Sequence, residues 1–455
     1  MDNLIKIFKL CGILIVLLTV IFVLIFLYYK LNNSIKQKYF IAIFNLLFFT
    51  FISGIFGGLY LISITVFSFL IAKYLENNKS KIVLFFGIIL PVIVLLSYKI
   101  LIKDSIIFTI FGIKQILKII GISFFTLQII SYIVDVYKGY DSGNYLEVLS
   151  FIGYFPVIVS GPILKWHEYV DNTYKIKYNK QKIYDGIFLI AIGMAKKIIV
   201  ADRLAYAVNI VYEVPLAYSG LSLLLTTFAY TMQLYFDFSG YSDIVIGISK
   251  ILGIDIKDNF NMPYLSKSFS EFWKRWHISL SSWLTEYIYI PLGGNRNGKI
   301  KTYLNIMIVM LLSGFWHGFT LNFILWGLLH GCLLILQKSI FKNFNGILGN
   351  FITIILINFL WVPFRLSKFD DIIIVFKNII TLSKGIEYYY IYTIIFLVFF
   401  VLYNIYSYKF LNSNKFKITE SLDTFKGKLI LIAIIMAIIM FGNYTGQTSF
   451  IYGNF

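Results

Sequence analysis

Three of the four histidines in the chain lie close together in the sequence, between residues 277 and 330. They are His277, His317 and His330, and the fourth is His167. A buried imidazole stays neutral and can take a proton from a hydroxyl near neutral pH, which is the work of a general base. The clustering predicts that any reactive site lies in this part of the chain.

His317 is the strongest candidate for a general base. It stands in SGFWHG, inside residues 302–337, which contain no Asp, Glu, Lys or Arg. Gly314 and Gly318 flank it, and glycine allows another molecule to come close to the backbone. An ionisable group in such an apolar run is a functional hypothesis by default. A core histidine bonded to a backbone carbonyl is the alternative, and spacing alone does not decide between them.

The other histidines have more structural interpretations. The apolar residues of 266–294 follow helical spacing, which predicts one amphipathic helix with His277 on its buried face. This helix would lie at the membrane interface or enter the bundle obliquely. From spacing alone, a hydrogen-bonded core histidine is favoured for His277 and also for His330. His167, in KWHEYVD, is expected to be a solvated loop residue.

The sequence gives little support for other kinds of catalytic site. Asp237 and Asp243 in FDFSGYSD follow an apolar stretch, where capping of the next helix competes with a direct catalytic role. No metal is expected, because no histidines are paired at i, i+4 and Cys11 and Cys332 are isolated. Serine-hydrolase and nucleotide-binding motifs are also missing from the sequence.

The composition places this chemistry in a membrane. Of the 455 residues, 59% are hydrophobic and 14% are charged, against roughly a quarter charged in a soluble domain. The net charge of +18 comes from lysine clusters between apolar runs, which indicates contact with membrane lipid rather than nucleic acid. A soluble enzyme is excluded.

The elements that must position the site are membrane helices. Charge-free windows predict ten to twelve transmembrane spans in one all-α membrane domain over residues 1–455. Residues 39–71 are expected to break into two helices at Gly54, Gly57 and Gly58. Residues 302–337 would span about 54 Å as one helix, so a break is expected between Gly314 and Asn322.

Several long motifs together carry a family resemblance. They are FPVIVSGPI at 155–163, AKKIIVADRLA at 195–205, the run from AYTMQLYFDFSGYSD to RWHISLSSW and PLGGNR, then SGFWHG and LWGLLHG. The chain resembles the membrane-bound O-acyltransferase (MBOAT) family, nearest to bacterial membrane subunits of alginate O-acetylation. The resemblance covers most of the chain beyond about residue 120. It divides the domain into N-terminal helices (1–120), a catalytic core (121–340) and C-terminal helices (341–455).

The resemblance implies a mechanism and a set of residues. The acyl donor would be a thioester, acetyl-CoA, used from the cytoplasmic side, with no bound cofactor and no metal. The acetyl group would pass through a central tunnel surrounded by transmembrane, re-entrant and interfacial helices. His317 would be the catalytic base and His277 a second essential residue. Further candidates for contact with substrate or tunnel are Trp316, Arg275, Asp237, Asn295 and Arg296.

The resemblance also implies partners and a location. The acceptor would be a hydroxyl of an extracellular or cell-wall polysaccharide, and an extracytoplasmic esterase-like acetyltransferase would complete delivery. The protein would be a multi-pass protein of the bacterial cytoplasmic membrane. The terminal FIYGNF departs from the subfamily's expected ending, which leaves partner contact at the C-terminus open.

Two alternatives remain. A D-alanyl transferase of teichoic acid synthesis shares the tryptophan-histidine motifs but is expected to lack PLGGNR, present here at 291–296. A transporter or flippase would explain Asp237, Asp243 and His317 within the membrane. However, the sequence has no visible internal repeat.

Overall fold

The computed structural model describes residues 19, 21–101, 107–110, 113–116, 119–340, 346–410 and 424–443. FIYGNF lies outside these residues, as does half of the first predicted span at 10–29. A short apolar helix covers Ile21–Lys30. The longer helices are α2 (Ser34–Asn77), α3 (Lys81–Leu101), α4 (Ile122–Lys138), α5 (Tyr145–Ile152), α6 (Trp166–Thr173), α7 (Lys180–Ala195), α8 (Asp202–Glu213), α9 (Gly220–Ile251), α10 (Phe269–Arg275), α11 (Ile278–Leu284), α12 (Gly298–His317), α13 (Leu321–Ser339), α14 (Gly346–Arg365), α15 (Phe369–Thr381), α16 (Ile391–Phe410) and α17 (Phe425–Phe441).

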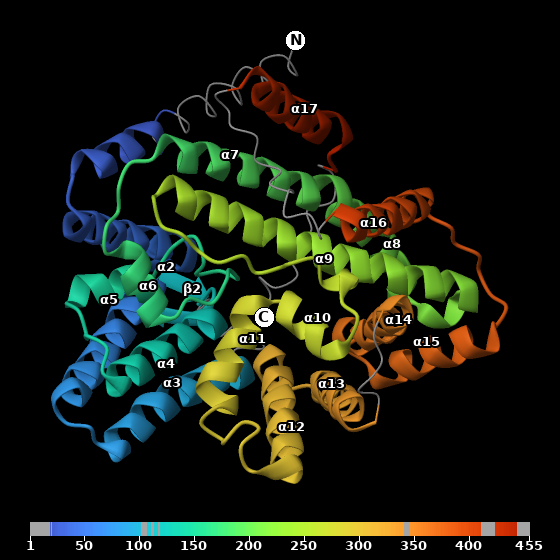
Figure 1. The fold of residues 1–455 in the computed structure, drawn as a ribbon, viewed down its shortest axis with the longest axis horizontal. Helices are drawn as coiled ribbons and strands as arrows, with labels where there is room; N and C mark the ends of the chain where they lie inside the picture. Colours follow the sequence, from blue (N-terminus) through green and yellow to red (C-terminus); the bar gives the residue numbers. More distant parts are fainter. Residues whose placement is uncertain are drawn as a thin grey trace.

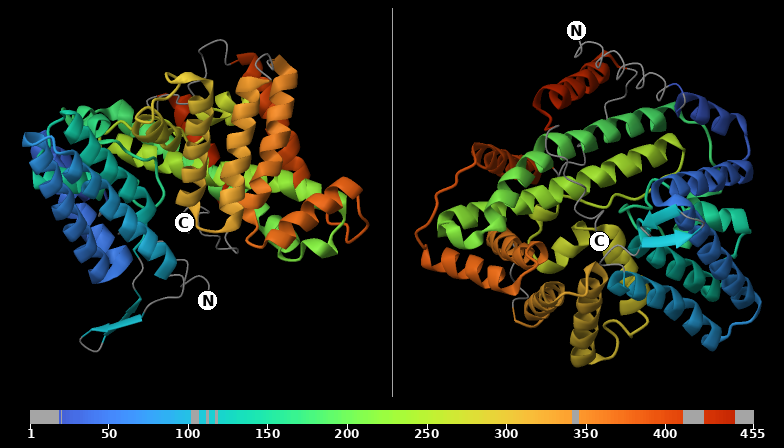
Figure 2. Two further views of the ribbon diagram at one scale, coloured as in Figure 1. Left: turned by 90° about the horizontal axis from the view of Figure 1, so that it is seen from below. Right: turned by 180° about the vertical axis from the view of Figure 1, so that it is seen from behind.

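The all-helical prediction is confirmed. Among the described residues, regular strand occurs only in the antiparallel pair β1 (Ile107–Ile110) and β2 (Ile113–Ile116). Helices α7 and α9 run alongside each other across the molecule, with α2 to α6 near one end of this pair and α14 and α15 near the other end (Figure 1). Helices α10 to α13 lie between these groups, and both further views show α12 and α13 side by side (Figure 2). The site candidates come mainly from this middle group.

Four glycines let α7 and α9 approach closely. A Cβ on Gly186 would lie 2.5 Å from the carbonyl oxygen of Gly247, and a Cβ on Gly247 would meet that of Gly186 at the same distance. Gly193 and Gly240 oppose each other in the same way, at 2.4 and 2.7 Å. Both pairs are separated by seven residues along their helices, so two turns of each helix are in backbone contact.

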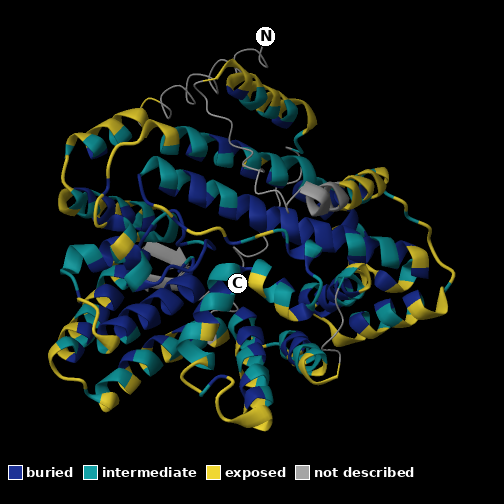
Figure 3. Cartoon of the chain, in the orientation of Figure 1, coloured by how far each residue is buried: buried dark blue, intermediate teal, exposed yellow. Residues whose placement is uncertain are grey.

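Two hydrophobic clusters make up the core, and Trp316 packs against both. One cluster joins α2, α4 and α5, and the other surrounds the middle of α9 together with α10, α11 and α14. The middle of α9 is buried (Figure 3). Trp316 precedes His317, so the strongest candidate base lies where the two clusters meet.

Two predicted helix breaks are confirmed. Gly54 interrupts α2 with φ 73° and ψ 177°, a conformation that glycine adopts without strain. The uncharged run at 302–337 breaks between His317, where α12 ends, and Leu321, where α13 begins.

The predicted single helix over 266–294 is wrong. The chain forms α10, turns at His277 with φ 44°, forms α11 and continues as the π-helix η5 (Thr285–Tyr289). Helical spacing of apolar residues persisted through the turn because α10 and α11 bury their aromatic faces in the same cluster. The spacing of apolar residues does not reveal a single residue with a left-handed backbone conformation.

The predicted helix end near Asp237 is also wrong. Asp237 and Asp243 lie inside α9, which continues for 32 residues to Ile251. Neither carboxylate caps a helix. Each is paired with a lysine of the neighbouring segment, as described below, and this pairing allows charged residues to remain within a long helix.

Four described helices are long and apolar enough to cross a membrane: α2, α3, α13 and α14. Ile21–Lys30 and Ile391–Leu402 are shorter apolar helices. The total of ten to twelve spans and the three-part division of the domain stay predictions.

Candidate functional site

His317 ends α12 inside an aromatic enclosure. The residue is 4% exposed. Its imidazole centroid lies 4.8 Å from the ring of Trp316, 5.0 Å from Phe364 and 5.4 Å from Trp326. Gly318 follows with extended backbone, so the helix stops directly after the histidine. The enclosure keeps water away from the imidazole and fixes the orientation of its ring.

Lys99 of α3 binds the end of α12. Its Nζ donates to the carbonyl oxygen of Trp316 and, at 3.4 Å, to that of His317. The last carbonyls of a helix carry a partial negative charge and lack partners within the helix, so an ammonium group is favourable there. No pattern in the neighbouring sequence predicts a role for Lys99, because only tertiary contact brings it to position 317.

His277 is held by Asn259. The Nδ1 of His277 lies 3.3 Å from Asn259 Oδ1, which also accepts from the backbone N–H and hydroxyl of Ser279 at 3.1 and 2.9 Å. An oxygen accepting from a backbone N–H identifies the amide orientation, so His277 Nδ1 carries the hydrogen of the bond. The proton-accepting position of the neutral imidazole is therefore Nε2.

Trp316 lies between the two candidate histidines. Its ring centroid is 4.8 Å from that of His317 and 6.4 Å from that of His277. The indole N–H donates to the carbonyl oxygen of Ser123 at 3.1 Å, which anchors the ring to α4. The structure therefore gathers His277, Trp316 and His317 into one place from segments 40 residues apart in the sequence.

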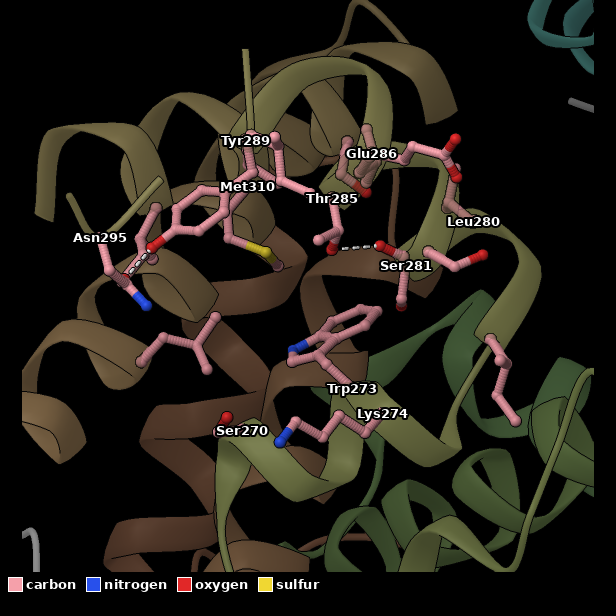
Figure 4. A pocket seen from close by; sticks show the side chains of 18 of the residues that line it. Ser270, Trp273, Lys274, Leu280, Ser281, Thr285, Glu286, Tyr289, Asn295 and Met310 are labelled. Carbon is pink, nitrogen blue, oxygen red and sulfur yellow. Dashed lines mark hydrogen bonds between the residues drawn. The ribbon is translucent and has the colours of Figure 1, made fainter. Parts of the chain in front are cut away.

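A cavity of about 1130 Å³ lies close to this group in the sequence, although its lining does not include His277, Trp316 or His317 (Figure 4). Its walls combine apolar side chains with hydroxyl groups, and Trp273, Thr285 and Met310 face it from three sides. Ser313 lines it one turn before His317, and Ile278, which follows His277, lines it as well. Three lysines contribute positive charge to the lining: Lys165, Lys274 and Lys338.

The polar candidates near the cavity have different positions. Asn295 lines the cavity and accepts hydrogen bonds from Lys338 Nζ at 2.8 Å and from the Tyr289 hydroxyl. Arg275 pairs with Glu271 at 2.8 Å. Arg296 donates to the carbonyl oxygen of Ile290 at 3.3 Å. Neither arginine belongs to the cavity lining, so Asn295 alone of the three is brought to it.

Asp237 and Asp243 are neutralised by lysines of the π-helical segment after α7. Lys197 Nζ lies 2.7 Å from Asp237 Oδ1 and 2.8 Å from Asp202 Oδ1, and Lys196 Nζ lies 2.6 Å from Asp243 Oδ2. Buried charges are stable when they are paired in this way. These ion pairs join α9 to the segment that follows α7, which gives both aspartates a structural role.

His330 is buried, as expected for a core histidine, but the expected hydrogen bond is not seen. The residue is 0% exposed, and neither ring nitrogen has a hydrogen-bond partner among the described residues. Trp273, Trp326 and Trp361 surround it, with centroids 5.1, 4.8 and 6.0 Å away.

The prediction that His167 is a solvated loop residue is wrong. It lies in α6, where its Nδ1 is 2.9 Å from Asp135 Oδ2 and its backbone N–H donates to the same oxygen. The hydrogen bond to Asp135 raises the pKa of His167 above its ordinary value. Asp135 comes from α4, and nothing in the local sequence KWHEYVD indicates that partner.

Asp135, His167 and Glu286 place three possible metal-ligand atoms within 4.8 Å of one another. Both carboxylates also have protein partners: the Tyr287 hydroxyl donates to Asp135 Oδ1 at 2.8 Å, and Lys165 pairs with Glu286 Oε2 at 2.8 Å. These contacts, with the bond from His167 to Asp135, link the three residues into one network of hydrogen bonds and ion pairs. The arrangement fits a polar network better than a metal centre.

Comparisons with known proteins identify the family. Residues 140–366 match the membrane-bound O-acyltransferase family, MBOAT. The chain is 41% identical over 261 residues to a probable alginate O-acetylase of Pseudomonas aeruginosa (56% of this chain, 50% of that protein). It is 35% identical over 301 residues to a peptidoglycan O-acetyltransferase of Helicobacter pylori (58% and 57%). It is 31% identical over 237 residues to a teichoic acid D-alanyltransferase of Bacillus subtilis (48% and 59%).

The matched segment contains α10 to α13, the cavity between them and the candidate histidines, whereas Lys99 lies before it. The chain spans about half the length of the alginate O-acetylases that it matches. The helical architecture, the long apolar helices and this match agree with a multi-pass membrane protein. The chain belongs to the membrane-bound O-acyltransferase family.

Proposed function

We propose that this protein transfers an acetyl group from acetyl-CoA, on the cytoplasmic side of the membrane, toward hydroxyl groups of an extracellular or cell-wall polysaccharide. His317 acts as the general base, and His277 assists from the other side of Trp316. The acetylase and acetyltransferase names of relatives at 35 to 41% identity support acetyl as the transferred group.

The observation that carries the proposal is the cavity that reaches from Lys274 and Lys338 to within one turn of His317. The lysines of the lining suit the phosphate groups of a CoA thioester. The mixed apolar and hydroxyl walls suit its pantetheine group. The aromatic enclosure beyond excludes water, which protects a reactive acyl group from hydrolysis.

The chemistry needs one proton carrier. His317 takes the proton of the acceptor hydroxyl while that oxygen attacks the thioester carbonyl carbon. The tetrahedral intermediate collapses, the carbon–sulfur bond breaks, and the thiolate receives the proton from His317. A neutral imidazole is regenerated, so one residue serves both half-steps.

The proposal includes a location and partners. The protein resides in the cytoplasmic membrane of a bacterium, in contact with membrane lipid. An extracytoplasmic esterase-like acetyltransferase receives the acetyl group and completes its delivery to the polymer. The relatives named for alginate and peptidoglycan acetylation support an acceptor in the cell envelope.

The central test is acetyl transfer from radiolabelled acetyl-CoA to cell-envelope polymer in membranes carrying His317→Ala. Loss of a general base lowers the rate by roughly 100- to 10,000-fold. Protein abundance in the membrane is measured in parallel. Wild-type transfer by His317→Ala protein at equal abundance contradicts the proposal.

The relative named for D-alanyl transfer supports a second candidate, in which the acyl group is D-alanine. Mass spectrometry of esters released from the envelope by mild base separates the two, since acetate and alanine differ in mass. Acetate that disappears on deletion of the gene supports the first candidate, and D-alanine that disappears supports the second.

A further inference from the structure

Four buried nitrogen atoms of α10 and α13 have no hydrogen-bond partner among the described residues. They are Nε1 of Trp273, Nε1 of Trp326, and both ring nitrogens of His330. Trp326 is 1% and His330 0% exposed. Buried polar atoms are nearly always hydrogen-bonded, because leaving a donor unmet is costly, so each such group requires an explanation.

The three side chains form one compact group. Trp273 lies 5.7 Å from Trp326 and 5.1 Å from His330, and Trp326 lies 4.8 Å from His330, measured between ring centroids. We call this group the indole–imidazole cluster. One member borders the cavity and another borders the candidate base: Trp273 lines the cavity, which Trp326 and His330 do not, and the ring of Trp326 is 5.4 Å from that of His317.

The donor set indicates the chemistry of the missing partner. An indole N–H only donates, and a neutral imidazole adds one donor and one acceptor. Three donors against one acceptor suit a ligand atom with lone pairs, which is an oxygen. No carboxylate or ammonium belongs to the cluster, so a neutral oxygen that gains negative charge only during reaction fits better than a permanent anion.

We propose that the indole–imidazole cluster binds the carbonyl oxygen of the acyl thioester and stabilises the oxyanion that forms when the acceptor attacks. This inference rests on the proposed function and adds catalytic residues to it. The acceptor oxygen bonds to the carbonyl carbon, and the carbonyl π electrons move onto the oxygen facing Trp273, Trp326 and His330. Collapse returns them as the carbon–sulfur bond breaks and the thiolate leaves, protonated by His317.

Replacement of the donors tests the proposal. Trp326→Phe and His330→Phe remove N–H groups while keeping aromatic side chains. Removal of one such donor lowers kcat by roughly 100- to 1000-fold, because the interaction strengthens in the transition state. The KM for acetyl-CoA is expected to change by less than about threefold. His330→Gln, which keeps an N–H donor, is expected to recover part of the lost kcat.

Trp361→Phe is the matched control. Trp361 is equally buried and packs against Trp326, but its Nε1 already donates to the Tyr264 hydroxyl at 3.3 Å. It is expected to keep kcat within about threefold. Equal kcat values for Trp326→Phe, His330→Phe and Trp361→Phe at equal abundance overturn the cluster's role. If His317→Ala is fully active, by contrast, the proposed function itself fails.

Infrared spectroscopy gives a test that needs no change in the cluster. His317→Ala protein is loaded with acetyl-CoA carrying ¹³C at the thioester carbonyl, whose stretching frequency falls when it accepts hydrogen bonds. A band at or below its position in water supports the inference. A band at its position in an apolar solvent shows that the cluster donates nothing to the carbonyl and overturns it.

Discussion

The three lysines of the cavity lining differ in their partners. These partners decide which lysines can bind the phosphate groups of the proposed acyl donor. Lys165 pairs with Glu286 at 2.8 Å and is 6% exposed in its side chain. Lys338 donates to the neutral amide oxygen of Asn295, and Lys274 is an exposed residue of the same lining. The last two lysines are the ones available to phosphate groups.

We therefore expect Lys274→Met and Lys338→Met each to raise the KM for acetyl-CoA by roughly 3- to 10-fold and to leave kcat nearly unchanged, since a phosphate contact acts equally in ground and transition states. The effect should shrink at high salt. Lys299→Met, an exposed lysine outside the cavity lining, is the control. A fall in kcat with constant KM would place these lysines in the chemical step instead.

His167 makes a pH-dependent contribution to stability. Its imidazole faces Asp135 at 2.9 Å, with Glu286 and Glu168 within 4.0 Å, and Lys138 and Lys165 pair with Glu286. Because the hydrogen bond to Asp135 raises its folded pKa, the protonated form is favoured by folding. The contribution is full below the ordinary pKa of 6.5 and is lost as pH rises through the folded pKa.

The thermal midpoint of the protein in detergent should accordingly exceed that of His167→Gln by more at pH 6 than at pH 9. His330→Gln changes the same residue type at a site without a carboxylate and serves as the control. A constant difference between wild type and His167→Gln over this range would show that charge at His167 adds no stability.

Among the helices, α3 contributes to the site through its contact with the end of α12. Lys99 reaches from α3 to the last carbonyls of α12, so it fixes the end of the helix that carries His317. The family match begins at residue 140, beyond α3. A helix outside the matched segment thus contributes a positioning residue.

Lys99→Met is expected to lower kcat by roughly 10- to 100-fold without a comparable change in KM, because small displacements of a reacting group are costly. Lys99→Arg should restore most of the activity, since it keeps charge and donors. Lys81→Met, an exposed lysine at the start of the same helix, is the control. Full activity of Lys99→Met would remove the positioning role.

The elements also show where sequence patterns succeed. The break between α12 and α13 was predictable, because an uncharged run of that length exceeds the bilayer and contains glycines at its centre. The turn at His277 was not, because Asn259 stabilises it from 18 residues away. Aromatic spacing on both sides of the turn is compatible with one helix or with two.

For the whole molecule, the proposed function requires that the cavity opens toward one particular side of the membrane. The cavity lining that contains Lys338 should face the cytoplasm if cytoplasmic acetyl-CoA enters there. In a background with Cys11→Ser and Cys332→Ala, Lys338→Cys is expected to react with a membrane-impermeant maleimide in inside-out vesicles and to be protected in intact cells. Labelling in intact cells would place the cavity on the opposite side.

The sequence by itself determined the class of the molecule, because membrane insertion depends on composition and on the length of apolar runs. An all-helical membrane protein, the break after His317 and the resemblance to the family all follow from local patterns, and the structure and the family match agree with them. Asp237 and Asp243 show the limit, since their place inside α9 depends on lysines 40 and 47 residues away.

Only the tertiary structure decided how the site is assembled. It brought Lys99 to the end of α12 and placed His167 against Asp135. It also left the nitrogens of His330, Trp273 and Trp326 buried without hydrogen-bond partners in the part of the chain that the structure describes. Each of these facts depends on contacts between distant segments, whose geometry is fixed by packing of the whole chain and carries no signature in the neighbouring residues.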